Sequence, residues 1–119
     1  MDSFCCVDFE VSGEKENVSQ FLDILSLEFF EHGCMAQFGC GKFRCVAHGQ
    51  MVCEWGVMST LEDDMKRFID CTRKYAVYVC LRGDKYASNV HEVLVVDRGE
   101  FLFYDRYEGL PRYTDGKAT

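Results

Sequence analysis

The side chains of this chain that could do chemistry are, first of all, those of eight cysteines and three histidines. Cys5 and Cys6 are adjacent, so in a strand their thiols point to opposite faces. No Cys-x-x-Cys pair occurs, which leaves zinc-ribbon and redox motifs without support. The nearest approach to a metal-ligating cluster comprises Cys34, Cys40, Cys45, His32 and His48. That spacing matches no ligand pattern, so we expect no metal, no cofactor, and reduced structural thiols rather than disulfides.

A cysteine beside a histidine can act as a nucleophile. His48 and His91 lie at the ends of expected strands, and either could activate a thiol that the fold brings close. A small thiol-dependent enzyme is therefore one alternative function. The sequence contains no GxxxxGK[ST] or HExxH motif, so phosphate-cradling and metalloprotease chemistry lack their usual residues. We expect a protein that is not an enzyme and has no catalytic residue.

Acidic side chains gather near the start of the chain. Residues 1–34 hold eight acids and one base, a net charge of −7, whereas residues 35–119 hold twelve of each. A negative surface repels phosphate and attracts lysine- and arginine-rich partners. We expect one exposed acidic patch that steers a basic partner, with ordinary solvation of a helix as the other interpretation. The expected steering charges are Glu10, Glu14, Glu16, Asp23, Glu28 and Glu31.

The elements that would position these groups begin with an alternating segment. Residues 4–12 alternate apolar and polar side chains, which predicts a half-buried strand ended by Gly13. Apolar side chains then recur with a period of 3.6 residues over 15–31, which predicts a helix. Glycine-rich residues 33–41 are interpreted as a loop. The next expected element is a hairpin with arms 42–48 and 51–57 and a Gly49-Gln50 turn.

The second half of the chain begins with a helix signal. Ser59 with Glu62, or Thr60 with Asp63, has the spacing of a capping box. The later expected elements are a strand over 76–82, a polar loop over 83–89, and a hairpin with arms 90–97 and 100–106 around Arg98-Gly99. We expect one domain over 1–107 and a polar tail over 108–119.

The order β-α-β-β-α-β followed by a hairpin predicts the fold class. Two amphipathic helices, each between strands, favour an α+β, ferredoxin-like βαββαβ sandwich with an additional C-terminal β-hairpin. In it, both helices cover one face of an antiparallel sheet. No apolar run reaches the length of a membrane span, and no secretory leader opens the chain. We therefore expect a cytoplasmic protein without a membrane partner.

Three motifs follow one another in the second half of the chain. They are Leu61-Glu62-Asp63-Asp64-Met65, Val77-Tyr78-Val79-Cys80-Leu81-Arg82-Gly83 and Val95-Val96-Asp97-Arg98-Gly99. Together with Val7 to Leu25, they resemble small ferredoxin-like proteins of phages and plasmids, of the anti-CRISPR or anti-defence type. The family's glycine-and-acid stretch after the fourth strand is replaced here by residues 84–89. The resemblance implies the fold and a mobile-element origin, and it implies no catalytic residue.

These observations predict an acidic, non-enzymatic protein-binding module. Its expected role is that of an anti-CRISPR-like inhibitor from a mobile element, acting in the cytoplasm of the host cell. Its expected partner is a host protein whose basic surface normally binds nucleic acid. Tyr78 and Phe103 are the expected aromatic contacts, because such side chains are favoured at binding hot spots.

Two other functions remain alternatives. Ferredoxin-like sheets often carry RNA, and Phe101, Phe103, Arg98 and Arg106 cluster in the last hairpin. The chain is acidic and has no RNP-like run, however, so we do not expect direct nucleic-acid binding. Strand edges left open by this topology would also suit a structural or assembly subunit.

Overall fold

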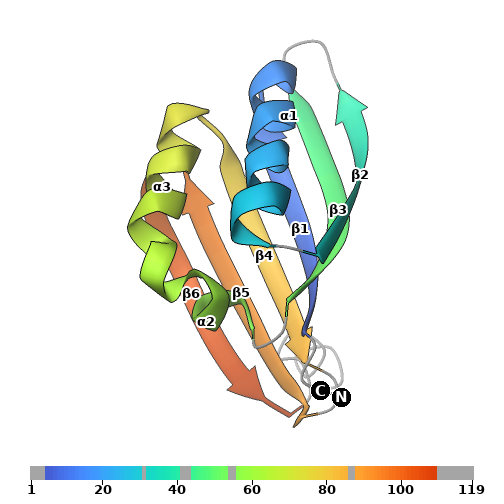
Figure 1. The fold of residues 1–119 in the computed structure, drawn as a ribbon, viewed down its shortest axis with the longest axis vertical. Coiled ribbons are helices and arrows are strands. Elements are labelled where there is room, and N and C mark those ends of the chain that lie inside the picture. The colour runs from blue at the N-terminus through green and yellow to red at the C-terminus, as the bar shows by residue number, and fades with distance from the viewer. Residues whose placement is uncertain (1–4, 31, 41–43, 54–55, 86–87, 110–119) are drawn as a thin grey trace, which may run out of the picture.

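The computed structural model of the chain describes residues 5–30, 32–40, 44–53, 56–85 and 88–109. They form an α+β fold with a six-stranded antiparallel sheet (Figure 1), which confirms the predicted class. The elements are β1 (Cys5–Gly13), α1 (Lys15–Ile24), the π-helical η1 (Leu25–Phe29), β2 (His32–Cys40), β3 (Cys45–Cys53), α2 (Val57–Leu61), the 3-10 segment η2 (Glu62–Asp64), α3 (Met65–Lys74), β4 (Tyr78–Lys85), β5 (Val90–Asp97) and β6 (Glu100–Glu108).

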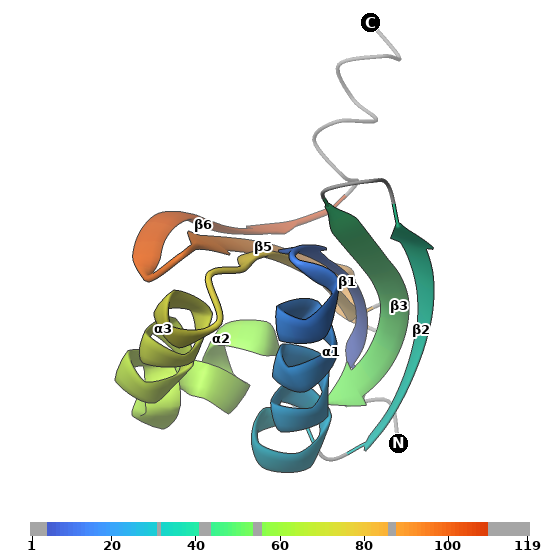
Figure 2. The ribbon, with the colours of Figure 1, turned by 90° about the horizontal axis from the view of Figure 1, so that it is seen from above.

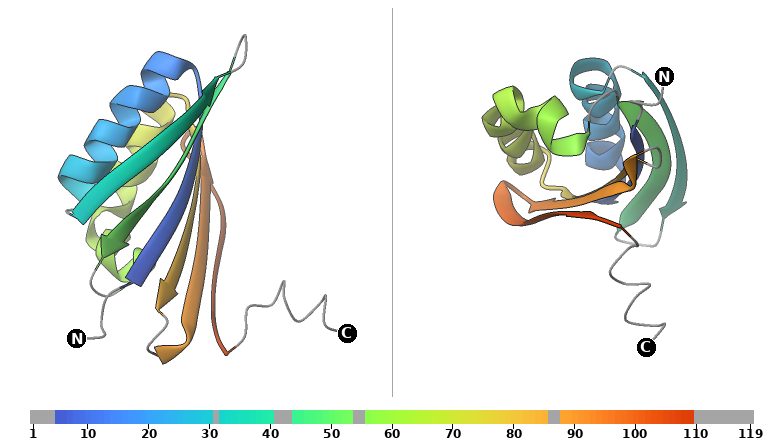
Figure 3. Two further views of the ribbon diagram at one scale, coloured as in Figure 1. Left: turned by 90° about the vertical axis from the view of Figure 1, so that its right-hand side faces the viewer. Right: turned by 90° about the horizontal axis from the view of Figure 1, so that it is seen from below.

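The strands lie in the order β2-β3-β1-β4-β5-β6, and each neighbouring pair is antiparallel. β5 and β6 continue the sheet beyond β4, so the order differs from that of a simple ferredoxin fold. Figure 2 shows α1, α2 and α3 on one side of the sheet. We call this side of the sheet the helix face. The opposite side, the open face, carries no helix of the described residues (Figure 3).

β1 forms as its alternation predicts. The odd-numbered side chains from Cys5 to Val11 are buried on the helix face. Cys6 and Asp8 are exposed on the open face, and Glu10 is half-buried there. Because successive side chains of a strand point to opposite faces, β1 divides its apolar and acidic residues between the two sides of the sheet.

The core lies between the helix face and the helices. The Phe68 ring of α3 lies 6.1 Å from the Phe21 ring and 5.4 Å from the Phe29 ring, measured between centroids. Phe21 and Phe68 are fully buried, and the Arg67 guanidinium lies 4.3 Å from the centroid of Phe29. This cluster joins α1 and η1 to α3 and closes the layer that covers the sheet.

The helix predicted over 15–31 ends as a wider turn. After Ile24 the chain continues as η1, and the Phe30 N–H donates to the Leu25 carbonyl over 2.8 Å. A π turn inserts one residue into the helical repeat, so the side chains that follow are rotated. Phe29 and Phe30 are buried as a result, whereas Leu27 is 79% exposed.

The first predicted hairpin is wrong. The expected loop over 33–41 falls largely within β2, and Gly49 and Gln50 lie inside β3 instead of forming a turn. Gly49 is opposed by Phe9 on one side and by Ala36 on the other. Hydrogen-bonded neighbours on both sides of β3 outweigh the turn preference of a glycine.

Two boundaries in the second half also differ from prediction. The helix begins at Val57, two residues before Ser59, and its N-cap residue is Gly56, which has no side-chain cap. The predicted capping boxes are therefore wrong. β4 extends to Lys85, so the expected loop over 83–89 begins later than predicted.

The second predicted hairpin, formed by β5 and β6, is confirmed. Arg98 and Gly99 have φ angles of 46° and 86°, the positive values that a two-residue type I′ turn requires. The Gly99 N–H donates to the Thr72 hydroxyl over 2.9 Å, and Arg73 donates to the Gly99 carbonyl over 3.0 Å. A Cβ at position 99 would meet Arg73 side-chain atoms at 2.5–2.9 Å, so glycine is required for this close approach. The expected tail lies outside the described residues from residue 110 onward.

Candidate functional site

The outermost strand β6 exposes three consecutive large apolar side chains. Phe101, Leu102 and Phe103 are 44%, 49% and 49% exposed. β6 is the last strand of the sheet, so among the described residues one side of its backbone has no neighbouring strand. The register with β5 shifts between Val95 and Val96, which marks a bulge at this place. An edge strand with exposed apolar side chains is a surface on which another polypeptide can add.

Charged side chains surround this apolar segment. β6 carries three carboxylates and one guanidinium, a net charge of −2, on Glu100, Asp105, Glu108 and Arg106. Arg106 lies 3.7 Å from Glu108. The surface therefore combines apolar contact area with a negative rim, and it complements an apolar segment flanked by lysine or arginine.

Of the two predicted aromatic contacts, Phe103 belongs to this surface and Tyr78 lies apart from it. Tyr78 is half-buried in β4 and faces the open face, opposite Asp97 of β5. Burial raises its pKa. β5 separates Tyr78 from β6, so the two aromatic side chains do not form one cluster.

The fold separates one member of the predicted acidic patch from three of the others. Glu10 lies on the open face of β1. Glu14 precedes α1, while Glu16 and Asp23 lie within it, and all three are exposed in the helix layer. The alternation of β1 and the reversal of the chain into α1 place Glu10 on one side of the sheet and the three carboxylates at α1 on the other.

Glu28 differs from the other predicted steering charges because a cation of the same chain binds it. Its carboxylate forms an ion pair with Arg67, which also lies 3.6 Å from Asp64. About half of the Glu28 side chain is exposed. The sixth predicted charge, Glu31, lies outside the described residues.

The two predicted histidine bases lie on the open face. The Nδ1 atom of His91 lies 2.6 Å from an Asp84 oxygen, and the His91 ring stacks on Tyr107. His48 is exposed in β3, opposite Glu10. Cys5 and Cys53 are buried on the helix face, so the sheet separates these thiols from both histidines. Within the described residues, no group of three or more His, Cys, Asp or Glu side chains is placed to hold a metal ion.

The sequence did not predict that the fold would bring two buried cysteines together. Cys5 of β1 is directly opposed by Cys53 of β3. Interaction with the neighbouring Cys5 thiol lowers the pKa of Cys53 to about 7, and interaction with Cys53 raises the pKa of Cys5. Only the register of β1 against β3 could have identified this pair, and the incorrect Gly49-Gln50 hairpin concealed that register.

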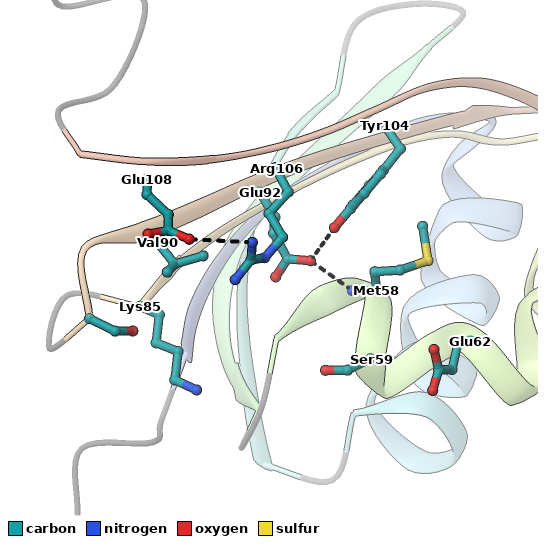
Figure 4. Close-up of a pocket in the computed structure, with 10 residues that line it drawn as sticks. Met58, Ser59, Glu62, Lys85, Val90, Glu92, Tyr104, Arg106 and Glu108 are labelled. Atoms are coloured by element: carbon teal, nitrogen blue, oxygen red, sulfur yellow. Dashed lines mark hydrogen bonds and ion pairs between the residues drawn. The ribbon is translucent and has the colours of Figure 1, made fainter.

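Glu92 is a second buried group that sequence reasoning missed (Figure 4). Its side chain is almost fully buried, and its two oxygen atoms accept hydrogen bonds from the Val57 and Met58 N–H groups over 2.9 and 3.1 Å. The Tyr104 hydroxyl donates to the second oxygen over 2.7 Å. Burial, followed by this hydrogen bond, raises the pKa of Tyr104. Glu92 of β5 thus caps α2 in place of the predicted capping box. Its hydrogen bond with Tyr104 connects α2 to β6.

A cavity of about 600 Å³ adjoins Glu92, between α2 and the last strands. Figure 4 draws its lining residues, Met58, Ser59, Glu62, Lys85, Ser88, Val90, Glu92, Tyr104, Arg106 and Glu108. The lining mixes three carboxylates with two cations. Both Glu92 oxygens already accept hydrogen bonds from the chain. We therefore interpret Glu92 as a structural connection at the cavity wall.

None of the helices in the described ranges has the length and apolar character needed to cross a bilayer. Comparison of this chain with protein-family models, with curated proteins and with solved structures finds no match.

Proposed function

We propose that this chain is a non-enzymatic protein-binding module that contacts its partner through β6. The observation that carries the proposal is the run of three large apolar side chains, each nearly half exposed, on an edge strand. Exposed apolar side chains on an open strand edge are typical of surfaces to which a partner segment adds. Aromatic side chains supply most of the contact energy in many interfaces.

The charge of the chain supports a basic partner. β6 has a net charge of −2 and the whole chain of −7, so lysine and arginine side chains are attracted from a distance. In its most specific form, the proposal is an anti-CRISPR-like inhibitor from a mobile element that acts in the host cytoplasm. It would bind a host protein that normally handles nucleic acid. The exposed acids at α1 would steer the encounter while β6 makes the contact.

We also propose that part of the sheet forms a ferredoxin-like unit. β1 to β4 lie in the order β2-β3-β1-β4, and helical segments connect β1 to β2 and β3 to β4. This arrangement supports a ferredoxin-like unit, to which β5 and β6 add a hairpin. The hairpin that extends the sheet is then also the element that provides the binding surface.

The β6 surface is tested by replacing Phe101 and Phe103 with serine together. We expect partner affinity to fall by about 2–4 kcal/mol, roughly 30- to 1000-fold, because buried aromatic contacts are lost. The tagged protein would first capture its partner from a lysate of a candidate host. Titration calorimetry with the purified partner would then give the two affinities.

Phe38 offers a matched control for this experiment. It is 47% exposed and lies in β2, at the opposite edge of the sheet. A Phe38→Ser variant should bind as the unmodified protein does. Unchanged affinity of the β6 double variant, or an equal loss in Phe38→Ser, would contradict the proposal. Sedimentation at several concentrations would show whether a second copy of the chain occupies β6 instead.

The steering charges make a separate prediction. Reversing Glu16 and Asp23 to lysine should slow association several-fold at low salt, and the difference should vanish near about 1 M salt, where screening is complete within about 3 Å. Stopped-flow measurement of the association rate tests this. The control variant reverses Glu62 and Asp63, which are exposed beside α2. Equal slowing by both pairs would indicate an effect of net charge instead of a local one.

A further inference from the structure

Cys5 and Cys53 face each other at one end of the sheet. They are directly opposed in the ladder between β1 and β3, and both are buried on the helix face. Opposed residues of antiparallel strands have Cα atoms about 4.5–5.5 Å apart. This separation lies within the about 4.4–6.8 Å that a disulfide spans. The two sulfur atoms can therefore be joined without moving one strand relative to the other.

The surroundings of the pair favour one thiolate. Interaction with the Cys5 thiol lowers the pKa of Cys53 to about 7, with burial opposing it and the Thr60 hydroxyl and the Gly56 backbone acting in the same direction. Cys5 keeps its proton, since its interaction with Cys53 and its burial raise its pKa. The thiolate is the nucleophilic form of cysteine, so Cys53 is the attacking sulfur and Cys5 the resolving one.

We propose that Cys5 and Cys53 form a redox-active dithiol that reduces a hydroperoxide and closes into a disulfide. An electron pair of the Cys53 sulfur attacks a peroxide oxygen, and the O–O bond breaks. The leaving hydroxide or alkoxide takes up the proton that the Cys53 thiol had released on ionising, and Cys53 becomes a sulfenic acid. The Cys5 sulfur then attacks Cys53, the S–S bond forms, and the hydroxyl leaves as water with the Cys5 proton. Two thiols and one hydrogen peroxide thus yield one disulfide and two waters.

Access to the pair depends on the size of the oxidant. Both thiols are buried, and hydrogen peroxide is little larger than water, so a local opening of the structure is enough to admit it. Cys6 points to the open face, away from the pair. Cys40 and Cys45 are also opposed, across β2 and β3, so the experiment has to separate these two pairs.

The test treats the full-length reduced protein with hydrogen peroxide and follows its intact mass. We expect the loss of two hydrogen atoms, reversed by dithiothreitol, and a peptide map that links Cys5 to Cys53. Cys45→Ser and Cys6→Ser should form this link at the unmodified rate, whereas Cys53→Ser should form none. The map of the unmodified protein needs no variant, so it decides the matter even if Cys53→Ser fails to fold.

The rate of closure should depend on pH in a defined way. Because a lowered thiol pKa means that the thiolate is present above that pKa and lost below it, the rate should level off above about pH 7. Below that value it should fall about tenfold for each pH unit. A rate that still rises steeply through pH 8.5 would overturn the assignment of Cys53 as the attacking thiolate. Thiols that all remain alkylatable after treatment, or a link confined to Cys40 and Cys45, would overturn the proposal itself.

Discussion

Replacing Phe68 with alanine is expected to lower the free energy of unfolding by about 3–5 kcal/mol. Phe68 is fully buried, and its ring contacts both Phe21 and Phe29. Removing it opens a cavity at the place where α3 meets α1 and η1, and rigid neighbouring strands cannot collapse into that space. Urea unfolding followed by circular dichroism measures the difference.

Phe103→Ala is the matched control, since it removes the same atoms from a side chain that is 49% exposed. Its stability should stay within about 1 kcal/mol of the unmodified protein. If the two variants lose equal stability, Phe68 does not occupy the core position described. A smaller slope of unfolding free energy against urea would instead indicate a change in compactness.

Replacing Glu92 with alanine should cost about 2–4 kcal/mol of unfolding free energy. The change leaves the N–H groups of Val57 and Met58, and the hydroxyl of Tyr104, without their acceptor. Glu92→Gln keeps one acceptor oxygen and should lose less. Hydrogen exchange should show the loss of protection first at Val57 and Met58.

Tyr104→Phe tests the hydrogen bond between Glu92 and β6 separately from the cap that Glu92 provides to α2. It removes one donor and leaves the cap of α2 intact, so its cost should be near about 1 kcal/mol. The double variant with Glu92→Ala should then cost less than the sum of the single changes, because both remove the same hydrogen bond. Additive costs would show that Tyr104 and Glu92 act independently.

Local patterns predicted the elements whose structure depends on neighbours in the chain. Strict alternation identified β1, and Arg98-Gly99 identified the β5–β6 hairpin, because in each case the signal and the structure involve the same few residues. Gly49-Gln50 has an equally local turn signal. There, pairing with β1 and β2 decides the outcome, and those partners are 40 and 13 residues away at Phe9 and Ala36.

In the candidate site, too, the sequence reveals features that depend on neighbouring residues and misses those that depend on distant ones. Phe103 could be selected from its place in an aromatic hairpin, since strand edges are exposed in any such topology. The Glu92 cap joins residues 34 and 35 positions apart, and no spacing rule within one helix could reveal it. Glu10 is close to the other acids in sequence but lies on the other side of the sheet, because one residue of register decides the face to which its side chain points.

The docked turn between β5 and β6 has a thermodynamic consequence. Thr72 and Arg73 hold Gly99, and the Arg98 N–H donates to the Val77 carbonyl over 2.9 Å. A strand anchored at its tip in this way is preorganised, so complex formation sacrifices little conformational entropy. We therefore expect association to proceed as rigid docking, without a slow refolding phase.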